Sequence, residues 1–435
     1  MTHASVRDRL AALEIFGIKL GLSNISALCD ALGHPERAFH VVHVAGTNGK
    51  GSVTAMVQAA LQAAGIASAR YTSPHLVDLA ERFVIGAAPV DAATLESRGA
   101  VVLDTADALV HSGTLAAPPT FFEATTALAF ELFRHAGVQV AVIEVGLGGR
   151  WDATNVVAPV VTAITSIGLD HQQQLGSTLS AIAGEKAGIL KPGIPVVMGP
   201  LAPEAEAVVR RTAAERRAPV IGTYDGVALG VTHDDGRPVL RVRTPAHDYG
   251  TLTCNLRGDH QIDNAVTAIR TLECLADAGL AVPPEAIADG LRHVEWPGRL
   301  EQFTLEDGRS LLLDAAHNPD GAVVLARYLR RWHPERPPLV FAAMRDKAIP
   351  EILSALLPVV GPIILTAPDM PRAMPPSELA AAVAHLVRGR DVQVEASPIR
   401  AVQRALTLGS PVCVAGSIFL AGAVREACMA HAILK

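Results

Sequence analysis

The feature that most constrains the fold is a short apolar segment followed directly by a glycine-rich loop and an amphipathic helix. Val41–Ala45 is a candidate strand, and in Ser52–Ala64 the apolar positions recur at intervals of three and four residues, which predicts a one-faced helix. The loop between them comprises Gly46, Thr47, Asn48, Gly49, Lys50, Gly51 and Ser52. A strand, a glycine-rich turn and a helix N-terminus in this order are typical of a nucleotide phosphate site.

The residue types in this loop suit a phosphate ligand. Lys50 would reach the outer phosphates, and the hydroxyl of Ser52 would ligate a magnesium ion. The spacing departs from the usual GxxxxGK[ST] pattern, because only two residues separate Gly46 from Gly49 and Gly51 precedes Ser52. The alternative is a glycine turn that begins an ordinary helix. The preceding strand and the Lys-Gly-Ser ending favour the nucleotide phosphate site.

The rest of the chain alternates short β-branched segments with Ala- and Leu-rich helical segments, which predicts an α/β fold with a mostly parallel sheet covered by helices. We expect a large N-terminal P-loop-type ATPase domain over residues 1–295 and a smaller C-terminal Rossmann-like domain over residues 296–435. Pro297-Gly298 is the expected hinge, and residues 226–256 are expected to form a β-rich insertion. The candidate strands are Val41–Val44, Val138–Val145, Val160–Ile167, Pro195–Met198, Ser310–Leu313, Leu339–Ala342, Ile363–Thr366, Val392–Val394 and Val412–Ala415.

Composition excludes several classes of protein. Half of the 435 residues are hydrophobic and the formal charge is −6, without a long basic run, so we expect a globular protein that binds neither nucleic acid nor membrane. The five cysteines are dispersed without a CxxC pair, which argues against a disulfide framework or a thiolate zinc site. No stretch of 18 apolar residues occurs and the first residues are polar, so we expect a cytoplasmic protein, and we expect a monomer.

Polar side chains follow further candidate strands. Ser73 lies in a loop, Glu144 ends the segment Val138–Ile143, and Asp170-His171 is expected to end the strand Val160–Ile167. Open α/β sheets place their ligand chemistry at the carboxyl ends of strands, and oxygen and imidazole ligands suit a divalent ion. Glu144 therefore becomes a candidate for metal or substrate contact and His171 a candidate metal ligand, although each has a purely structural alternative.

A lysine in the segment Gly184–Gly193 is harder to interpret. Glu185 and Lys186 fit a solvated helix face that ends near Gly188. Spacing alone leaves a catalytic role for Lys186 open.

Eight segments occur in an order that has a known counterpart. They are His43–Ser52, Thr72–Leu76, Glu144–Asn155, Leu169–His171, Gly184–Gly193, Gly258–Ala265, Pro297–Glu301 and Asp314–Gly321. In this order they resemble the folylpolyglutamate synthase and dihydrofolate synthase family, a branch of the Mur-ligase superfamily. The resemblance implies an ATP-dependent amide ligase that activates a carboxylate as an acyl phosphate, which the amino group of L-glutamate then attacks. The implied acceptors are dihydropteroate and folates.

The resemblance also implies roles for individual residues. The implied magnesium site comprises Ser52, Ser73, Glu144, His171 and Lys186. Lys186 matches a lysine that is carbamylated in related ligases, and with Glu144 and His171 it forms the implied catalytic group. Asn264, Arg299, Asp314 and His317 match the remaining ATP contacts. Because the phosphate loop and Arg299 fall in different predicted domains, we expect ATP to favour domain closure.

A final group of positions corresponds to the family's pteridine site. Its implied members are Arg82, Thr120, Phe121, Phe122, Glu123, Trp151, Asp152 and Ala153. The aromatic rings would wall a flat heterocycle, and the carboxylates would pair with ring N–H groups. Core packing is the alternative for both phenylalanines.

Three other functions compete with the bifunctional enzyme. One is an enzyme that performs polyglutamylation alone. Another is a Mur-type ligase on peptidoglycan precursors, which would need an additional N-terminal domain of about 100 residues. Only about forty residues precede the phosphate loop, which disfavours it. The third is a non-catalytic nucleotide-binding regulator, in which Glu144, His171 and Lys186 would be incidental.

Overall fold

The computed structural model describes residues 4–17, 19 and 21–434, and the chain divides into two compact units. The first comprises Met1–Val231, Val239–Cys254 and Ile262–Val294, and the second comprises Thr232–Pro238, Asn255–Gln261 and Glu295–Lys435. The two short segments of the second unit lie within the range predicted for the first domain. The assignment of functional domains to 1–295 and 296–435 stays a prediction.

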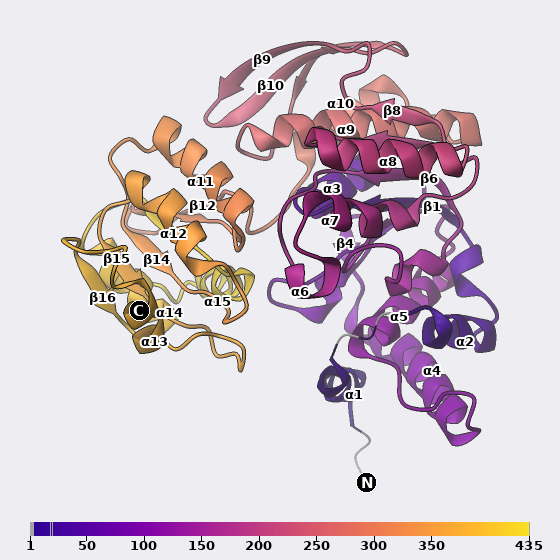
Figure 1. Cartoon of the computed structure of the whole chain (residues 1–435), viewed down its shortest axis with the longest axis horizontal. Coiled ribbons are helices and arrows are strands. Elements are labelled where there is room, and N and C mark those ends of the chain that lie inside the picture. Colours follow the sequence, from indigo (N-terminus) through magenta and orange to yellow (C-terminus); the bar gives the residue numbers. More distant parts are fainter. Residues whose placement is uncertain (1–3, 18, 20, 435) are drawn as a thin grey trace. The chain divides into compact units, whose positions relative to one another are not determined.

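An eight-stranded sheet organises the first unit, with the order β4-β3-β2-β5-β1-β6-β7-β8 (Figure 1). The strands from β2 to β8 in this order pair in parallel, whereas β3 and β4 form an antiparallel edge. The strands are β1 His40–Ala45, β2 Ser68–Tyr71, β3 Phe83–Ile85, β4 Ala88–Pro89, β5 Val140–Glu144, β6 Pro159–Ile164, β7 Val196–Met198 and β8 Val220–Gly222. The sheet confirms the predicted α/β class.

Helices of this unit lie between successive strands in sequence, in several places as pairs, as in the case of α4 and α5 between β4 and β5. They are α1 Val6–Ala12, α2 Ser23–Ala31, α3 Lys50–Ala63, α4 Ala92–His111, α5 Phe121–His135, α6 Gln172–Leu175, α7 Leu179–Lys186, α8 Pro203–Glu215, α9 His260–Leu275 and α10 Pro284–His293. The helix predicted to start at Ser52 begins at Lys50, and α10 packs closely against α3.

One strand ends earlier than predicted. β6 stops at Ile164, so Asp170 and His171 lie in the following loop and not at the strand tip. The physical reason is a long-range contact, because the hydroxyl groups of Thr165 and Ser166 donate hydrogen bonds to the carbonyl of Asn48 in the glycine-rich loop, 117 and 118 positions earlier in the chain.

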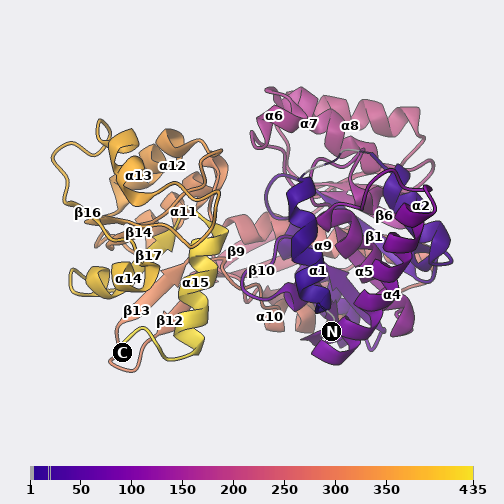
Figure 2. The same cartoon turned by 90° about the horizontal axis from the view of Figure 1, so that it is seen from below.

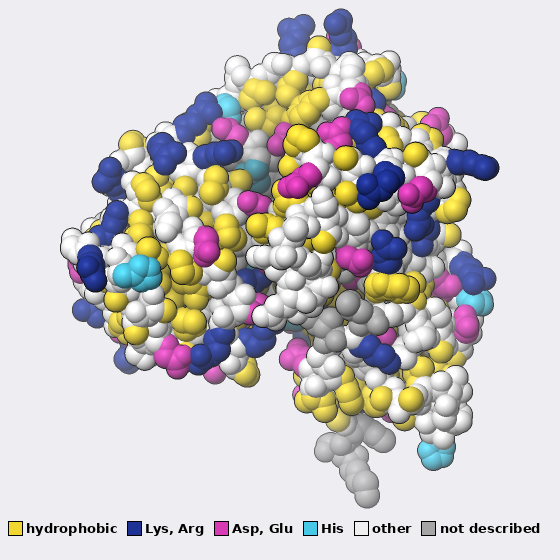
Figure 3. All heavy atoms as spheres, in the orientation of Figure 1, with side chains coloured by type: hydrophobic (Ala, Val, Ile, Leu, Met, Phe, Trp, Pro, Cys, Tyr) yellow, Lys and Arg dark blue, Asp and Glu magenta, His cyan; other side chains and the backbone are white. Residues whose placement is uncertain are grey.

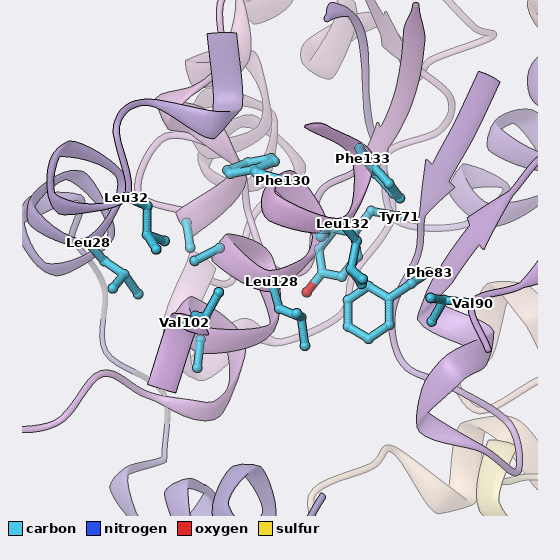
Figure 4. Close-up of a cluster of buried hydrophobic side chains, with 14 of the residues drawn as sticks. Leu28, Leu32, Tyr71, Phe83, Val90, Val102, Leu128, Phe130, Leu132 and Phe133 are labelled. Carbon is cyan, nitrogen blue, oxygen red and sulfur yellow. The ribbon is translucent and has the colours of Figure 1, made fainter. Parts of the chain in front are cut away.

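The mostly aliphatic core on one face of this sheet contains a group of aromatic rings. α5 contributes Phe130 and Phe133, and the rings of Tyr71 and Phe83 stack with centroids 5.7 Å apart (Figure 4). The buried Tyr71 hydroxyl lies 2.9 Å from Thr125 Oγ1, which satisfies its hydrogen bonding. The core therefore anchors β2, which leads into the loop that carries Ser73.

The predicted β-rich insertion is confirmed. It is a three-stranded sheet of order β11-β10-β9, with β9 Ala228–Asp234, β10 Arg237–Arg243 and β11 Asp248–Thr253. β10 and β11 pair antiparallel.

The second unit has a six-stranded sheet of order β12-β13-β17-β14-β15-β16, parallel except for β12. Its strands are β12 Glu301–Thr304, β13 Ser310–Leu313, β14 Leu339–Phe341, β15 Ile363–Leu365, β16 Val392–Val394 and β17 Val412–Ala415. Its helices are α11 Pro319–Trp332, α12 Ile349–Leu356, α13 Pro376–Val383, α14 Pro398–Leu406 and α15 Ile418–Met429. Figure 2 shows α11, α12 and α13 on one side of this sheet and α14 and α15 on the other, as the two core clusters require.

Acidic and basic side chains are interspersed on the face shown in Figure 3. Among the described residues, no helix is both long enough and apolar enough to cross a membrane.

Candidate active site

The glycine-rich loop joins β1 to the N-terminus of α3, and two of its glycines are required by close approach. A Cβ on Gly46, whose φ is +155°, would lie 2.0 Å from Thr165 Oγ1. A Cβ on Gly49, whose φ is +86°, would lie 2.4 Å from Asn264 Oδ1 on α9. Positive φ and the lack of space both demand glycine. Asn264 therefore lies directly against the loop.

Residues after β6 hold the loop in shape. Thr47 N donates to Ser166 O at 2.7 Å, and Asn48 N donates to Ser166 Oγ at 3.0 Å. Thr165 Oγ1 donates to Asn48 O at 2.6 Å. Thr165 and Ser166 were missed by sequence reasoning, because the predicted strand Val160–Ile167 included both residues, whereas β6 ends at Ile164 and leaves them at the carboxyl end of the strand.

Two lysines converge on one carbonyl oxygen of this loop. Lys50 Nζ donates to Gly46 O at 3.0 Å and to Thr47 O at 3.1 Å, and Lys186 Nζ donates to Gly46 O at 2.7 Å. Lys186 is the last residue of α7 and is buried, so its interpretation as a solvated helix residue is wrong. Burial first, and then the charge of Lys50, lowers the pKa of Lys186 to about 7. An amine with such a pKa is partly neutral at physiological pH.

Two predicted metal ligands meet at adjacent strand ends. Ser73 N donates to Glu144 Oε2 at 3.3 Å, and the Glu144 side chain is buried at the end of β5. His171 is at the N-terminus of α6 with a φ of 50°, and its Nε2 lies 4.0 Å from Asp170 Oδ1. Asp170 also acts electrostatically on Lys186, which makes it a further acidic group that sequence reasoning did not assign to the site.

These side chains suit a magnesium site that is completed by waters and substrate phosphates, and not a metal site made of protein ligands alone. Over the described part of the chain, no three His, Cys, Asp or Glu side chains group closely enough to hold a metal ion. Mg²⁺ is usually held by one or two carboxylates together with waters and substrate phosphates. The buried Glu144, which lies beside Ser73 on the strand next to β1, is one carboxylate of the kind that such a site uses.

The Thr120 and Glu123 pair, predicted to bind substrate, forms a capping box at the start of α5. Thr120 N donates to Glu123 Oε2 at 2.7 Å, and Glu123 N donates to Thr120 Oγ1 at 3.2 Å. Asn24 Nδ2 also donates to Glu123 Oε2, at 3.4 Å. The T-x-x-E spacing was a readable helix-start signal that the sequence interpretation overlooked.

Aromatic and basic side chains gather beside this cap. The guanidinium carbon of the buried Arg82 lies 5.1 Å from the centre of the Phe121 ring. Arg82 Nε donates to His75 Nδ1 at 2.8 Å, so His75 accepts through a neutral ring, and burial lowers its pKa to about 4. Arg82 and Phe121 are thus brought together, and their role in binding the substrate stays a prediction.

Phe122 packs on a glycine of the EVGLGGR segment. A Cβ on Gly146 would lie 2.4 Å from Phe122 Cζ, and the Phe122 and Tyr71 rings are 6.0 Å apart. Phe121 and Phe122 are both only partly buried against the core, so neither is a simple core residue.

The predicted residues at 151–153 differ in exposure. Trp151 is 47% exposed, whereas Asp152 and Ala153 are buried. Asp152 Oδ2 accepts from Leu147 N at 2.8 Å, and Asp152 Oδ1 accepts from Thr154 N at 3.0 Å. Burial raises the pKa of Asp152.

Three predicted ATP contacts belong to the second unit. Asp314 accepts from Leu300 N at 2.9 Å and from Ala316 N at 2.8 Å, and burial raises its pKa against the opposing charge of Arg299. His317 Nδ1 donates to Ala315 O at 2.8 Å. Arg299, Asp314 and His317 therefore lie on two loops that meet in this unit.

Comparison with known proteins agrees with these observations. The chain matches the Mur ligase middle domain over residues 44–272 and the Mur ligase, glutamate ligase domain over residues 298–418. A Bacillus subtilis (strain 168) protein named dihydrofolate synthase/folylpolyglutamate synthase is 37% identical over 364 residues, covering 82% of this chain and 83% of the relative.

Two solved structures share the whole fold. The structure of Mycobacterium tuberculosis folylpolyglutamate synthase complexed with ADP and AMPPCP superposes with a TM-score of 0.89 and 33% identity, covering 96% of this chain and 98% of that one. E. coli FolC in complex with DHPP and ADP gives a TM-score of 0.84 and 29% identity, covering 98% of both chains. This chain therefore belongs to the Mur ligase family, among the dihydrofolate synthases and folylpolyglutamate synthases, as the resemblance predicted.

Proposed function

We propose that this protein is an ATP-dependent ligase that joins L-glutamate to dihydropteroate and extends folates with further glutamates. The observation that carries the proposal is the convergence of Lys50 and Lys186 on Gly46 O. Two amino groups therefore lie at the glycine-rich loop, and a buried carboxylate, Glu144, ends the strand next to β1, which supports the proposed ATP and magnesium site. The relatives named as dihydrofolate synthase/folylpolyglutamate synthase support the same activity.

The reaction has two steps. An oxygen of the substrate carboxylate attacks the γ-phosphorus of ATP, the bond to the ADP oxygen breaks, and an acyl phosphate forms. The amino group of glutamate then attacks the acyl carbon, loses a proton and expels phosphate, which leaves an amide. Positioning and charge stabilisation supply most of the catalysis in such phosphoryl transfers.

Different groups of residues would bind the phosphates, the rest of ATP and the magnesium ion. The backbone N–H groups of Gly46–Ser52 and the amino group of Lys50 hold the phosphates. Arg299, Asp314 and His317 supply further ATP contacts, with the planar Arg299 suited to phosphate oxygens. Ser52, Ser73, Glu144, His171 and Lys186 would hold Mg²⁺. When bound, the ion would neutralise negative charge on the transferring phosphoryl group.

Lys186 would take part as a carbamate. Its neutral amine adds to the carbon of CO₂, a proton leaves, and the product is an anionic oxygen ligand. The lowering of its pKa to about 7 by burial and by Lys50 supports this chemistry, because only the unprotonated amine reacts.

The pteridine would lie against Phe121, Phe122 and Trp151, with Arg82, Glu123 and Asp152 available for polar contacts. Partial burial of both phenylalanines and the 47% exposure of Trp151 leave aromatic surface for a flat ring. The relative solved with DHPP and ADP supports a site of this type.

A direct test offers the protein ATP, Mg²⁺, L-glutamate and either dihydropteroate or tetrahydrofolate, with the products separated by mass spectrometry. We expect ADP and one added glutamate with either acceptor, and neither product from Lys50→Ala. Product from tetrahydrofolate alone would restrict the activity to polyglutamylation. ATP hydrolysis without any glutamylated product would overturn the ligase assignment.

The oligomeric state is a separate prediction. Light scattering during size-exclusion chromatography would test whether the protein is a monomer, as predicted.

A further inference from the structure

A histidine lies at the centre of the sheet, in the strand that leads to the phosphate loop. His43 on β1 is fully buried, between Ile143 of β5 and Thr162 of β6 in the strand register. Its neighbours in β1 are mostly valines, which fill a buried parallel strand at no polar cost. A buried imidazole in this position needs a hydrogen-bond partner to offset its desolvation.

That partner is the hydroxyl group of Thr154, which is also fully buried. His43 Nε2 lies 2.9 Å from Thr154 Oγ1, and Thr154 Oγ1 donates its single hydrogen to Asp152 Oδ1. Because the hydroxyl hydrogen is used on the carboxylate, His43 must donate to the hydroxyl oxygen. Its Nδ1 is then unprotonated, and no described residue offers this buried atom a hydrogen-bond partner. The two hydrogen bonds therefore run in one direction: His43 donates to Thr154, and Thr154 donates to Asp152.

Asp152 is held from both sides. Its Oδ1 receives the Thr154 hydroxyl and backbone N–H, and its Oδ2 receives Leu147 N at 2.8 Å. Leu147 follows Gly146, the residue on which the Phe122 ring packs. A shift of the Asp152 carboxylate would therefore move both its own oxygen atoms and the backbone beneath Phe122.

We propose that His43 is a positioning residue for the pteroate site, acting through Thr154 to hold Asp152 and the Gly146–Leu147 backbone in place. The inference rests on the proposed function, since it assumes that Asp152 and Phe122 contact the pteroate. His43 lies on β1, the strand that leads into the glycine-rich loop, and would nevertheless affect binding of the pteroate.

The experiment measures KM for dihydropteroate and for ATP in variants that break the chain at different points. His43→Leu removes the donor, and Thr154→Val removes the hydroxyl group with little change of shape. We expect each to raise KM for dihydropteroate about tenfold, with KM for ATP changed less than about twofold. The conservative variants His43→Gln and Thr154→Ser should recover most of the affinity.

Two controls separate positioning from general loosening of the core. Thr162→Val removes a buried hydroxyl from the strand position beside His43 and should leave both KM values unchanged. The double variant His43→Leu/Thr154→Val should resemble the single variants, because both remove the same line of contacts. If His43→Leu does not fold, the KM values of Thr154→Val alone decide whether the inference holds.

Some outcomes would overturn the inference. Equal rises in both KM values, or unchanged values in folded His43→Leu and Thr154→Val, would reduce His43 to a packing residue. Asp152→Asn distinguishes this failure from failure of the underlying function. If Asp152→Asn leaves KM for dihydropteroate unchanged, the substrate role of Asp152 is wrong. If it raises that KM while the other two variants do not, only the positioning role is wrong.

Discussion

Lys186 Nζ donates a hydrogen bond to Gly46 O at 2.7 Å, although the two residues are 140 positions apart in the chain. The contact joins the end of α7 to the first residue of the glycine-rich loop. It places an amine of lowered pKa at the site where ATP phosphates are proposed to bind.

Replacing Lys186 should therefore affect catalysis more than folding. We expect Lys186→Ala to lower kcat on the order of a hundredfold, because it removes the proposed carbamate ligand. ¹³C NMR of the protein in ¹³C-bicarbonate should show a carbamate signal that Lys186→Ala lacks. A wild-type spectrum without that signal would exclude the carbamate. The value of kcat in Lys186→Ala would then show whether the unmodified lysine contributes to catalysis.

Replacing Lys50 should act mainly on the nucleotide. The amino group of Lys50 is held over the loop by the Gly46 and Thr47 carbonyls, in reach of the proposed phosphate position. We expect Lys50→Ala to weaken binding of a non-hydrolysable ATP analogue by at least about tenfold in calorimetry. Unchanged affinity would contradict the phosphate assignment of the loop.

Glu144 should affect turnover and the magnesium requirement. We expect Glu144→Gln to lower kcat about a hundredfold and to shift the magnesium dependence to higher concentrations. Glu131→Gln is a matched control, since Glu131 is equally buried but paired with Arg134. An unaltered magnesium titration in Glu144→Gln would remove Glu144 from the metal site.

Gly46 should tolerate no side chain. A methyl group would lie 2.0 Å from Thr165 Oγ1, so we expect Gly46→Ala to lose about 1–3 kcal/mol of unfolding free energy and to bind the ATP analogue poorly. Gly184→Ala, in α7 with no heavy atom within 4 Å of its added Cβ, is the control and should keep wild-type stability. The measurement is urea unfolding, and equal stability of both variants would contradict the crowding at Gly46.

Acid should destabilise the protein through buried histidines. Burial lowers the pKa of His43 to about 3 and that of His75 to about 4 from an ordinary value of 6.5. As the pH falls, these histidines are therefore protonated at a higher pH in the unfolded state than in the folded state. The free energy of unfolding that depends on neutral histidines is fully present above about pH 6.5 and decreases as the pH falls toward 4. For His43 the loss at pH 5 is about 2 kcal/mol. Urea unfolding of wild type and His75→Gln between pH 7.5 and 5 should give a shallower pH dependence in the variant.

The local pattern of the sequence was sufficient to predict several strands and helices and the place of the glycine-rich loop between β1 and α3. Apolar periodicity predicted α3 to within a few residues at its start, and alternation of strands and helices predicted the parallel sheet. Glu144 was correctly placed at the end of a strand, because apolar runs show where a buried strand stops. His171 was placed wrongly, because hydrogen bonds from Thr165 and Ser166 to a distant loop ended the strand early.

The sequence by itself thus determined the class of fold, the glycine-rich loop and, through its ordered motifs, the family. Only the tertiary structure decided that Lys186 is buried against Gly46 and that His43 is linked through Thr154 to Asp152. The physical reason is that periodicity and turn chemistry arise between residues a few positions apart. Burial, lowered pKa values and shared hydrogen bonds depend instead on which distant segments the folded sheet brings together.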